Sequence, residues 1–228
     1  MDSAPALEIL NWAVATYGDK FAIATSFQKE GMVIVDMAAR VTSHPRVFTL
    51  ETGRLPGETL QMVDIVRERY GVAVEMVLPD PAEVDRMIAE HGRDLFYASV
   101  ENRRLCCEIR KVRPLERKLR ELRAWATGLR REQSETRAAV NRLEEVDGRM
   151  KISPLADWSA AQVDSYTREN NVPVHPLYAR GYASIGCAPC TRAILPGEEE
   201  RAGRWWWEEN ARKECGIHFT VDGLAKRA

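Results

Sequence analysis

Short apolar runs alternate with amphipathic stretches along the first 130 residues of the chain. The runs have the length and the β-branched or aromatic content of buried strands, and they lie at 21–26, 46–50, 72–78 and 124–128. Between them apolar residues recur at helical spacing, which predicts helices over 4–17, 32–40, 56–70 and 82–91. Strands that alternate with helices in this way predict an α/β fold built on a parallel sheet, with helices on both faces.

The second half of the chain is less regular. Residues 106–115 are predicted to be helical at least up to Pro114, and 142–152 to form one or two strands around the turn Asp147-Gly148. An amphipathic helix is predicted over 158–170, with Ser159 as its N-cap. We therefore divide the chain into an α/β domain over 1–195 and a C-terminal tail over 196–228.

Two turns follow strands at the edge of the sheet where ligands bind in parallel α/β folds. The first strand runs into the polar turn Ser26–Gly31 and then a helix, an arrangement that directs backbone N–H groups and a helix N-terminus toward phosphate. The turn has one glycine and no Walker pattern, so a plain connection between strand and helix fits it as well. The second turn, Glu51–Arg54, is expected at the same edge.

Composition narrows the class of protein. The chain of 228 residues is 45% hydrophobic and 29% charged, which is typical of a globular protein and excludes a disordered one. It has no apolar run long enough for a membrane span and no export signal at its N-terminus. The net charge is −1, yet residues 101–131 hold eleven Lys or Arg and four Glu. Such a basic block is either a solvated face or the wall of a pocket for a polyanion.

Four of the five cysteines fall into two pairs, Cys106-Cys107 and Cys187-x-x-Cys190. Without an export signal a reducing, cytoplasmic compartment is expected, where paired cysteines more often bind metal or do redox work than form disulfides. Four thiolates suit a structural zinc or a [4Fe–4S] cluster. Helical neighbours point about 100° apart and reach one ion poorly, so the adjacent pair favours the cluster over zinc. Four unligated thiols are the remaining alternative.

The fifth cysteine, Cys215, has no such partner. A leftover thiol on a tail that contains glycine is a candidate nucleophile, because thiolate is reactive and a tail can deliver it. A buried structural cysteine is the commoner fate of a lone one. The flanking residues Lys213, Glu214, Gly216 and His218 are not typical of a core and favour the reactive interpretation.

Four motifs in one order complete the pattern: Cys106–Leu115 (CCEIRKVRPL), Gly186–Arg192 (GCAPCTR), the stretch 196–207, and Lys213–His218 (KECGIH). Together they resemble the assimilatory adenylyl-sulfate reductases, which reduce adenosine 5′-phosphosulfate to sulfite and AMP with thioredoxin, or a glutaredoxin, as reductant. The resemblance runs from Phe21 to Phe219. It implies a fold similar to the PP-loop ATP pyrophosphatases, or adenine-nucleotide alpha-hydrolases, and a role in sulfate assimilation and cysteine biosynthesis.

The resemblance also implies roles for individual residues. Cys106, Cys107, Cys187 and Cys190 match the ligands of the family's [4Fe–4S] cluster, and Cys215 matches the nucleophile that becomes an S-sulfocysteine. The residues that match substrate-binding positions are Ser26, Thr52, Gly53, Lys111, Gly128, Arg137, Arg201 and Arg204. Lys111 matches a lysine between cluster and phosphosulfate, and its position four residues after Cys107 would put both on one face of a helix.

Some details depart from the family or stay open. Residues 26–31 read SFQKEG where many relatives have a Gly-Ala-Glu-Asp ending, and Glu51 stands where aspartate is more usual. His218 fits either assistance in deprotonation or packing of the tail. The tryptophans 205–207 are predicted to pack and anchor the tail rather than to stack on a base. No membrane or nucleic-acid partner is expected, and oligomeric state is open, a homo-oligomer included.

Three other functions compete with this interpretation. Relatives that reduce the 3′-phosphorylated nucleotide lack the four cluster cysteines, so these cysteines favour the unphosphorylated substrate. A metal-stapled nucleic-acid-binding module is disfavoured by the net charge of −1 and by the basic residues' position in the segment of the first cysteine pair. A PP-loop ATP-dependent transferase is disfavoured because the chain has no Gly-rich loop.

Overall fold

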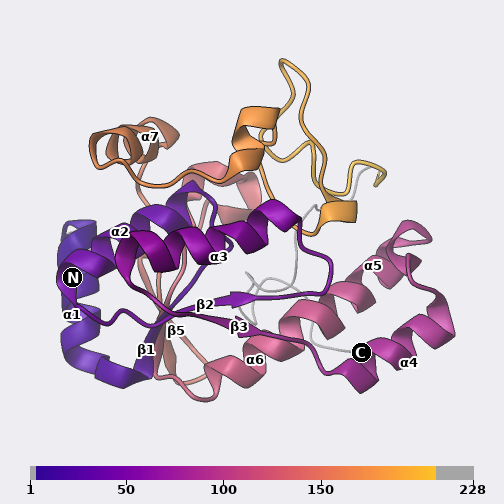
Figure 1. The fold of residues 1–228 in the computed structure, drawn as a ribbon, viewed down its shortest axis with the longest axis horizontal. Coiled ribbons are helices and arrows are strands. Elements are labelled where there is room, and N and C mark those ends of the chain that lie inside the picture. Colours follow the sequence, from indigo (N-terminus) through magenta and orange to yellow (C-terminus); the bar gives the residue numbers. More distant parts are fainter. Residues whose placement is uncertain (1–3, 209–228) are drawn as a thin grey trace.

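A six-stranded sheet forms the centre of the computed structural model, which describes residues 4–208 (Figure 1). Its strands are β1 (Phe21–Ala24), β2 (Val47–Leu50), β3 (Val74–Val77), β4 (Ala124–Ala126), β5 (Leu143–Val146) and β6 (Arg149–Ile152). Their order is β3-β2-β1-β4-β6-β5, and all pairs are parallel except the β5–β6 hairpin. The predicted parallel sheet is confirmed, with strands shorter than the apolar runs that indicated them.

The helices are α1 (Ala6–Tyr17), α2 (Lys29–Val41), α3 (Gly57–Tyr70), α4 (Pro81–His91), α5 (Val100–Cys107), α6 (Arg113–Leu119) and α7 (Ala160–Glu169). Ser159 caps α7 as predicted, because its Oγ accepts from Gln162 N at 3.2 Å. Helical structure does not stop at Pro114. That proline lies in the first turn of α6, where its missing N–H is not needed. A π-helical turn, η3 (Glu108–Val112), joins α5 to α6.

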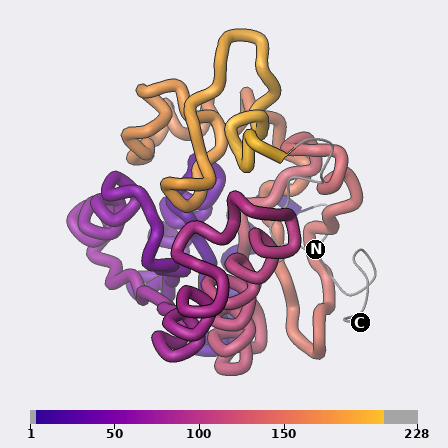
Figure 2. The backbone as a smooth tube through the Cα atoms, turned by 90° about the vertical axis from the view of Figure 1, so that its right-hand side faces the viewer, coloured from indigo at the N-terminus to yellow at the C-terminus, as the bar shows by residue number. Residues whose placement is uncertain are grey.

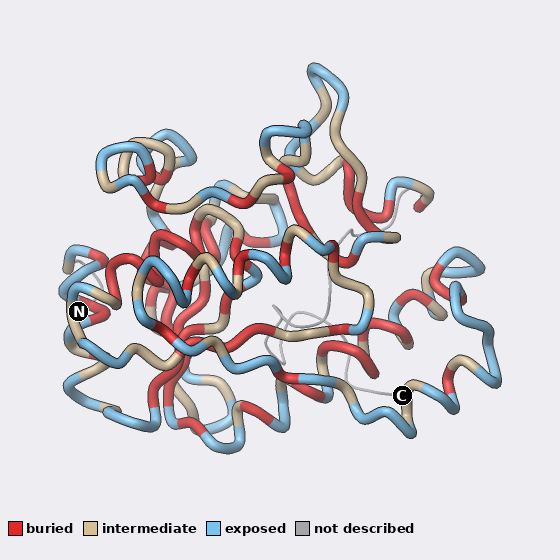
Figure 3. The backbone as a smooth tube through the Cα atoms, in the orientation of Figure 1, coloured by how far each residue is buried: buried red, intermediate tan, exposed pale blue. Residues whose placement is uncertain are grey.

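The two faces of the sheet bury different residues, because successive side chains of a strand point to opposite sides. Phe21, Ile23 and Val47 pack into a cluster with residues of α1, α2, α3 and α7. Ala22, Phe48 and Trp125 belong to a second cluster that includes residues of α6. In Figure 1 α2, α3 and α7 accordingly lie above the strands and α6 below them. The backbone of the central strands is buried and the outer turns are exposed (Figure 3).

The strand order reverses its direction at the pair β1–β4, because the chain builds β1, β2 and β3 outward on one side and then returns to place β4 on the other. In open parallel sheets the crevice at such a reversal is the place where ligands bind. The segment after α7 (orange to yellow in Figure 2) gathers on one side of the molecule. Within residues 4–208 no helix is long and apolar enough to cross a membrane.

His175 joins that late segment to α3. Its Nδ1 accepts from Leu177 N at 3.2 Å, so the ring proton sits on Nε2, which lies 2.9 Å from the hydroxyl of Thr59. The side chain is buried, with 1% exposure, and this burial lowers the pKa of His175 from its ordinary value of 6.5. The neutral ring is therefore a fixed part of the native structure.

We expect acid to weaken the fold through this residue. Below about pH 6.5 the unfolded chain takes up a proton at His175 that the folded chain does not, so the free energy of unfolding falls as the pH falls, by at most about 1.4 kcal/mol per pH unit. Above that pH the residue makes no pH-dependent contribution. Thermal unfolding of the wild type and of His175→Gln should therefore diverge in slope as the pH falls toward about 5. Parallel pH profiles for the two proteins would contradict this role.

Candidate active site

A cavity opens at the carboxyl edge of the sheet, where β1, β2 and β4 end. It is closed on the other side by residues 184–186 and 200–205 of the late segment. Seven of the eight residues predicted to bind substrate line it: Ser26, Thr52, Lys111, Gly128, Arg137, Arg201 and Arg204. The fold thus gathers side chains that are up to 178 positions apart in sequence (26 to 204) around one space.

Gly53 is the exception, since it does not belong to the lining that the structure gives this cavity. It has a φ of 70°, a backbone conformation that favours glycine, and its N–H donates to the carboxylate of Glu51 at 2.5 Å. A Cβ at this position would lie 3.1 Å from Nη1 of Arg110. Gly53 therefore shapes the turn after β2, and the predicted direct substrate contact stays a prediction.

Gly128 is required by a close approach between two elements. A Cβ there would lie 2.9 Å from Cβ of Glu30 and 3.0 Å from the backbone N of Gly31, closer than real Cβ atoms pack. The end of β4 consequently rests directly on the first turn of α2. Only a residue without a side chain allows these two backbones to form neighbouring walls of the cavity.

The turn after β1 is held by side chains rather than by glycines. Phe27 has a φ of 58° and is fully buried, and its N–H donates to Thr25 Oγ1 at 2.9 Å. Gln28 donates to Ser26 Oγ at 3.0 Å and accepts from Ile185 N at 2.8 Å. Gln28 bridges this turn to the segment just before Cys187, a role that the sequence pattern did not predict. The available signal was its place in a polar turn after a buried strand.

The two cysteine pairs meet in a second cavity. Cys106, Cys107, Cys187 and Cys190 are all buried free thiols that line it, together with Arg110 and Lys111. Lys111 lines both cavities, so the cysteine cavity adjoins the one at the strand ends. Cys187 Sγ lies 3.3 Å from Thr52 Oγ1, a further contact between the two walls.

The local geometry around Lys111 differs from the predicted α-helical one. Residues 108–112 form the π-turn η3, in which backbone hydrogen bonds run five residues back instead of four. Simple α-helical spacing from Cys107 is therefore the wrong reason for the placement of Lys111. Both residues nevertheless line the cysteine cavity.

Burial governs the protonation of the thiols. It raises the pKa of Cys190 to about 12, and it raises the pKa of Cys106 against the opposing effect of Arg110 and Lys111. Both groups are thus neutral thiols at pH 7 as long as nothing replaces their protons, and a metal that binds them must release these protons. Among residues 4–208 no three His, Cys, Asp or Glu side chains form a group that could hold one metal ion.

Trp205 connects the second cavity to the last described residue. Its ring is fully buried between two guanidinium groups, those of Arg103 and Arg204, each 4.6 Å from the ring centroid. Arg103 in turn forms a buried two-pronged ion pair with Glu208, at 2.8 and 2.9 Å. Packing was the predicted role of Trp205 and is confirmed, and the residue also lines the first cavity.

Gly186 makes room for Arg204. A Cβ at this glycine would lie 2.5 Å from Cζ of the Arg204 side chain. The guanidinium therefore occupies the space that any other residue at 186 would fill, directly before Cys187. Sequence reasoning had assigned Arg204 but not Gly186, because the two are 18 positions apart and nothing local marks their contact.

Known proteins with similar sequences provide independent evidence for the family of this chain. A family profile described as "Phosphoadenosine phosphosulfate reductase domain" matches residues 20–193. The chain is 52% identical over 205 residues to a Burkholderia cepacia protein named adenosine 5′-phosphosulfate reductase, covering 89% of this chain and 82% of that one. A protein of the same name from Allochromatium vinosum is 47% identical, with 94% and 84% covered.

Solved structures agree on the fold. A phosphoadenylyl-sulfate (PAPS) reductase from Candida auris, in a phosphate complex, superposes with a TM-score of 0.70 at 29% identity, covering 84% of this chain and 91% of that one. Yeast FAD synthetase superposes with a TM-score of 0.56 at 14% identity, covering 82% and 66%. The second similarity concerns the fold alone, and it matches the PP-loop architecture expected from the sequence.

Proposed function

The chain belongs to the phosphoadenosine phosphosulfate reductase domain family, and from this membership we propose that it reduces adenosine 5′-phosphosulfate to sulfite and AMP in sulfate assimilation. The observation that carries the proposal is the junction of two cavities at Lys111. One cavity has the basic lining that an anionic nucleotide needs, and the other holds four thiols. Relatives named adenosine 5′-phosphosulfate reductase match about nine-tenths of the chain.

The four thiols fit a [4Fe–4S] cluster better than a single ion. They line one cavity from two segments of the chain, and no three of them form a site for one metal ion within residues 4–208. A cluster takes one thiolate on each of its irons, which suits four ligands spread around a cavity. The basic groups of Arg110 and Lys111 beside the thiols would offset the negative charge of a thiolate-bound cluster. Bound there, the cluster would contribute its charge and redox properties to the edge of the substrate cavity.

The basic residues of the first cavity would bind the anionic end of the substrate. Lys111, Arg137, Arg201 and Arg204 line it, and charge-assisted hydrogen bonds from such groups are the stronger kind. Their second task is to stabilise the negative charge that develops on the phosphate oxygen when the bond from sulfur to that oxygen breaks. Ser26 and Thr52 would complete the site at the ends of β1 and β2.

The reaction proceeds in two steps that balance. The thiolate of Cys215 attacks the sulfur of the phosphosulfate, a bond from sulfur to sulfur forms, and AMP leaves with the electron pair of the broken S–O bond. A dithiol of the thioredoxin class then attacks Cys215 Sγ, and sulfite leaves with the electron pair of the broken sulfur–sulfur bond. The reductant's second thiol attacks the resulting mixed disulfide at the reductant's own sulfur, which closes the reductant's disulfide and releases Cys215 as a thiolate. The dithiol supplies two electrons and the sulfonyl sulfur receives them. None of the four described cysteines is in a disulfide, which fits a reducing, cytoplasmic compartment.

Cys215 lies outside the described residues, so its part rests on the family motif and on chain length. It follows Glu208 by seven residues, which can span at most about 25 Å. Glu208 is fixed to α5, the helix that carries Cys106 and Cys107, by its ion pair with Arg103. Glu208 therefore lies beside the cysteine cavity, which Arg103 lines. We accordingly keep the division into a domain over 1–195 and a catalytic tail over 196–228 as part of the proposal.

A direct assay tests the substrate. Protein purified without oxygen should convert adenosine 5′-phosphosulfate to AMP and sulfite when reduced thioredoxin is present. We expect the catalytic efficiency to be at least about tenfold higher than with the 3′-phosphorylated nucleotide, since one misfitted charged group costs roughly 1.5–3 kcal/mol. Equal or better efficiency with the 3′-phosphorylated form would instead assign the activity for which the Candida auris relative is named. Turnover of neither nucleotide would contradict the proposal.

A further inference from the structure

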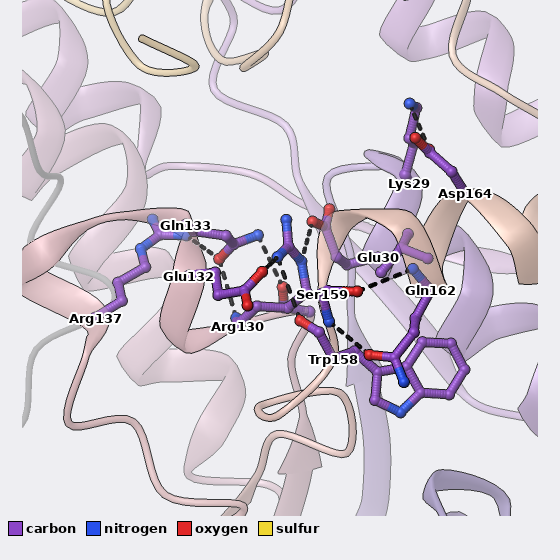
Figure 4. A network of polar contacts seen from close by, with 12 residues as sticks. Lys29, Glu30, Arg130, Glu132, Gln133, Arg137, Trp158, Ser159, Gln162 and Asp164 are labelled. Atoms are coloured by element: carbon purple, nitrogen blue, oxygen red, sulfur yellow. Dashed lines mark hydrogen bonds and ion pairs between the residues drawn. The ribbon is translucent and has the colours of Figure 1, made fainter.

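Two arginines on the loop after β4 differ in what holds them. Arg130 is 2% exposed, and its Nε donates to the carboxylate of Glu30 at 2.7 Å, so its charge is neutralised by an ion pair (Figure 4). Arg137 is also buried, and its Nη1 donates to the side-chain oxygen of Gln133 at 2.6 Å. Arg137 lines the cavity and Arg130 does not. One group that orients the cavity arginine is thus an uncharged amide.

Gln133 makes three contacts that fix the orientation of its amide. Its Oε1 accepts both from Arg137 and from the backbone N of Arg130 at 3.1 Å, and its Nε2 donates to the carbonyl of Gly128 at 3.3 Å. The two groups that face Oε1 can only donate and the carbonyl can only accept, so the reverse orientation of the amide would lose all three bonds. The side chain ties Arg137 to the end of β4, the rigid element beneath the cavity (Figure 4).

We propose that Gln133 is a positioning residue that holds the guanidinium of Arg137 in the cavity without adding a negative charge of its own. This inference rests on the proposed function, because the ligand of Arg137 is then the anionic part of adenosine 5′-phosphosulfate. A carboxylate at position 133 would orient the guanidinium as well as the amide does, but it would offset the charge that attracts the anion. The carboxylate of Glu30 offsets the charge of Arg130 in this way, and that ion pair stabilises the fold.

The local structure explains why the contact forms. Residues 131–133 and 135–137 are two short 3-10 turns, η4 (Arg131–Gln133) and η5 (Glu135–Arg137), separated by Ser134 in an extended conformation. The two turns place residues 133 and 137 on the cavity side of the loop, where both line it. Without the amide, the long side chain of Arg137 would lose a contact that limits its rotamers, and ordering it would then fall to the ligand.

The test is a double-mutant cycle with nucleotide affinity as the readout. Dissociation constants for adenosine 5′-phosphosulfate and for AMP are measured by calorimetry on four proteins that all carry Cys215→Ser, so that no bond to the substrate sulfur forms: the parent, Gln133→Ala, Arg137→Ala and the combination of the two. We expect Gln133→Ala to weaken binding about tenfold and Arg137→Ala about tenfold or more. In the Arg137→Ala background the second substitution should change affinity less than about twofold, because its target is gone.

Two further variants separate positioning from a structural role. Gln133→Glu keeps an acceptor for both donors and should fold, yet it should weaken binding at least as much as Gln133→Ala, with a smaller dependence of affinity on salt. Gln162→Ala is the matched control: the side-chain oxygen of this glutamine also accepts a hydrogen bond from a backbone N–H, that of Ser159 at 2.8 Å, and Gln162 is absent from the described cavity lining. Its affinity should equal that of the wild type.

Three outcomes would overturn the inference: additive effects in the cycle, wild-type affinity in Gln133→Glu, or losses in Gln133→Ala that appear in thermal stability and not in affinity. The proposed function fails in a different way. Nucleotide binding with the expected coupling, together with a wild type that releases no sulfite with reduced thioredoxin, would contradict the reaction and leave the role of Gln133 standing. Full turnover with an additive cycle would do the reverse.

Discussion

Serine in place of Cys215 is expected to abolish sulfite release while nucleotide binding and iron content stay at the wild-type level. A hydroxyl is far less nucleophilic than a thiolate at neutral pH, so the first bond to sulfur does not form. The variant changes none of the described residues that line the two cavities, which lie at positions 24–205. Steady-state turnover, iron analysis and AMP affinity, measured on one preparation, check all parts of the expectation.

The same residue allows a trapping experiment with the wild type. Mixing protein with adenosine 5′-phosphosulfate and no reductant should leave one sulfonate per chain, an added mass of roughly 80 Da, on the peptide that contains Cys215. Reduced thioredoxin should then remove it and release sulfite. A sulfonate mapped to another residue, or turnover by Cys215→Ser above background, would rule out the two-step mechanism.

Serine at Cys187 is expected to remove iron and activity together. The wild type, prepared without oxygen, should contain about four irons per chain, and loss of one of four thiolate ligands should reduce this to near zero. Cys187 is the most informative of the four, because its sulfur also contacts Thr52 in the wall of the substrate cavity. Serine is close to cysteine in size and can still form a hydrogen bond with Thr52. A loss of iron in this variant would therefore report the missing thiolate and not a missing contact with the cavity wall.

Cys215→Ser is the matched control for this experiment, since it makes the same chemical change at the fifth cysteine. The two variants should separate cleanly, with iron retained and chemistry lost at 215, and iron lost at 187. The same result is expected at Cys106, Cys107 and Cys190, which line the same cavity. An iron-free Cys187→Ser protein with full activity would show that the reaction needs no cluster.

Two of the described residues that link the cysteine cavity to the substrate cavity are positively charged. Lys111 lines both, and Arg110 donates from Nη1 to the backbone oxygen of Thr52 at 2.7 Å. A change in the charge of the group bound by the cysteines would therefore act on the substrate side through short contacts. Serine variants of the four cavity cysteines, which should lose the bound iron, should therefore bind AMP more weakly in addition to losing turnover. Cys215→Ser should keep the wild-type AMP affinity, and the same AMP titrations measure this difference.

Local pattern alone determined much of this protein. The alternation of buried strands and amphipathic helices fixed the α/β class, since period-2 and period-3.6 patterns reflect which side chains meet the core. Ser159 could be predicted as the N-cap of α7, because N-capping joins a side chain to a backbone N–H only three residues away in the sequence. The family was indicated by the two cysteine pairs, the leftover Cys215 and the order of the four motifs. The resemblance in turn predicted eight substrate-binding residues, seven of which line the first cavity.

Only the tertiary structure decided how these parts meet. Strand order put β1 beside β4 and so brought Ser26 and Gly128 to one cavity, although 102 positions separate them in the chain. The backbone that carries Lys111 is the π-turn η3, in place of the regular α-helix that the sequence had suggested. Gln133 lies only four residues before Arg137, but the two residues belong to separate 3-10 turns, so no helical or strand periodicity marked their contact. Gly186 was missed because it acts through Arg204, 18 positions later in the chain. Contacts of this kind depend on the three-dimensional approach of distant segments, which no local periodicity encodes.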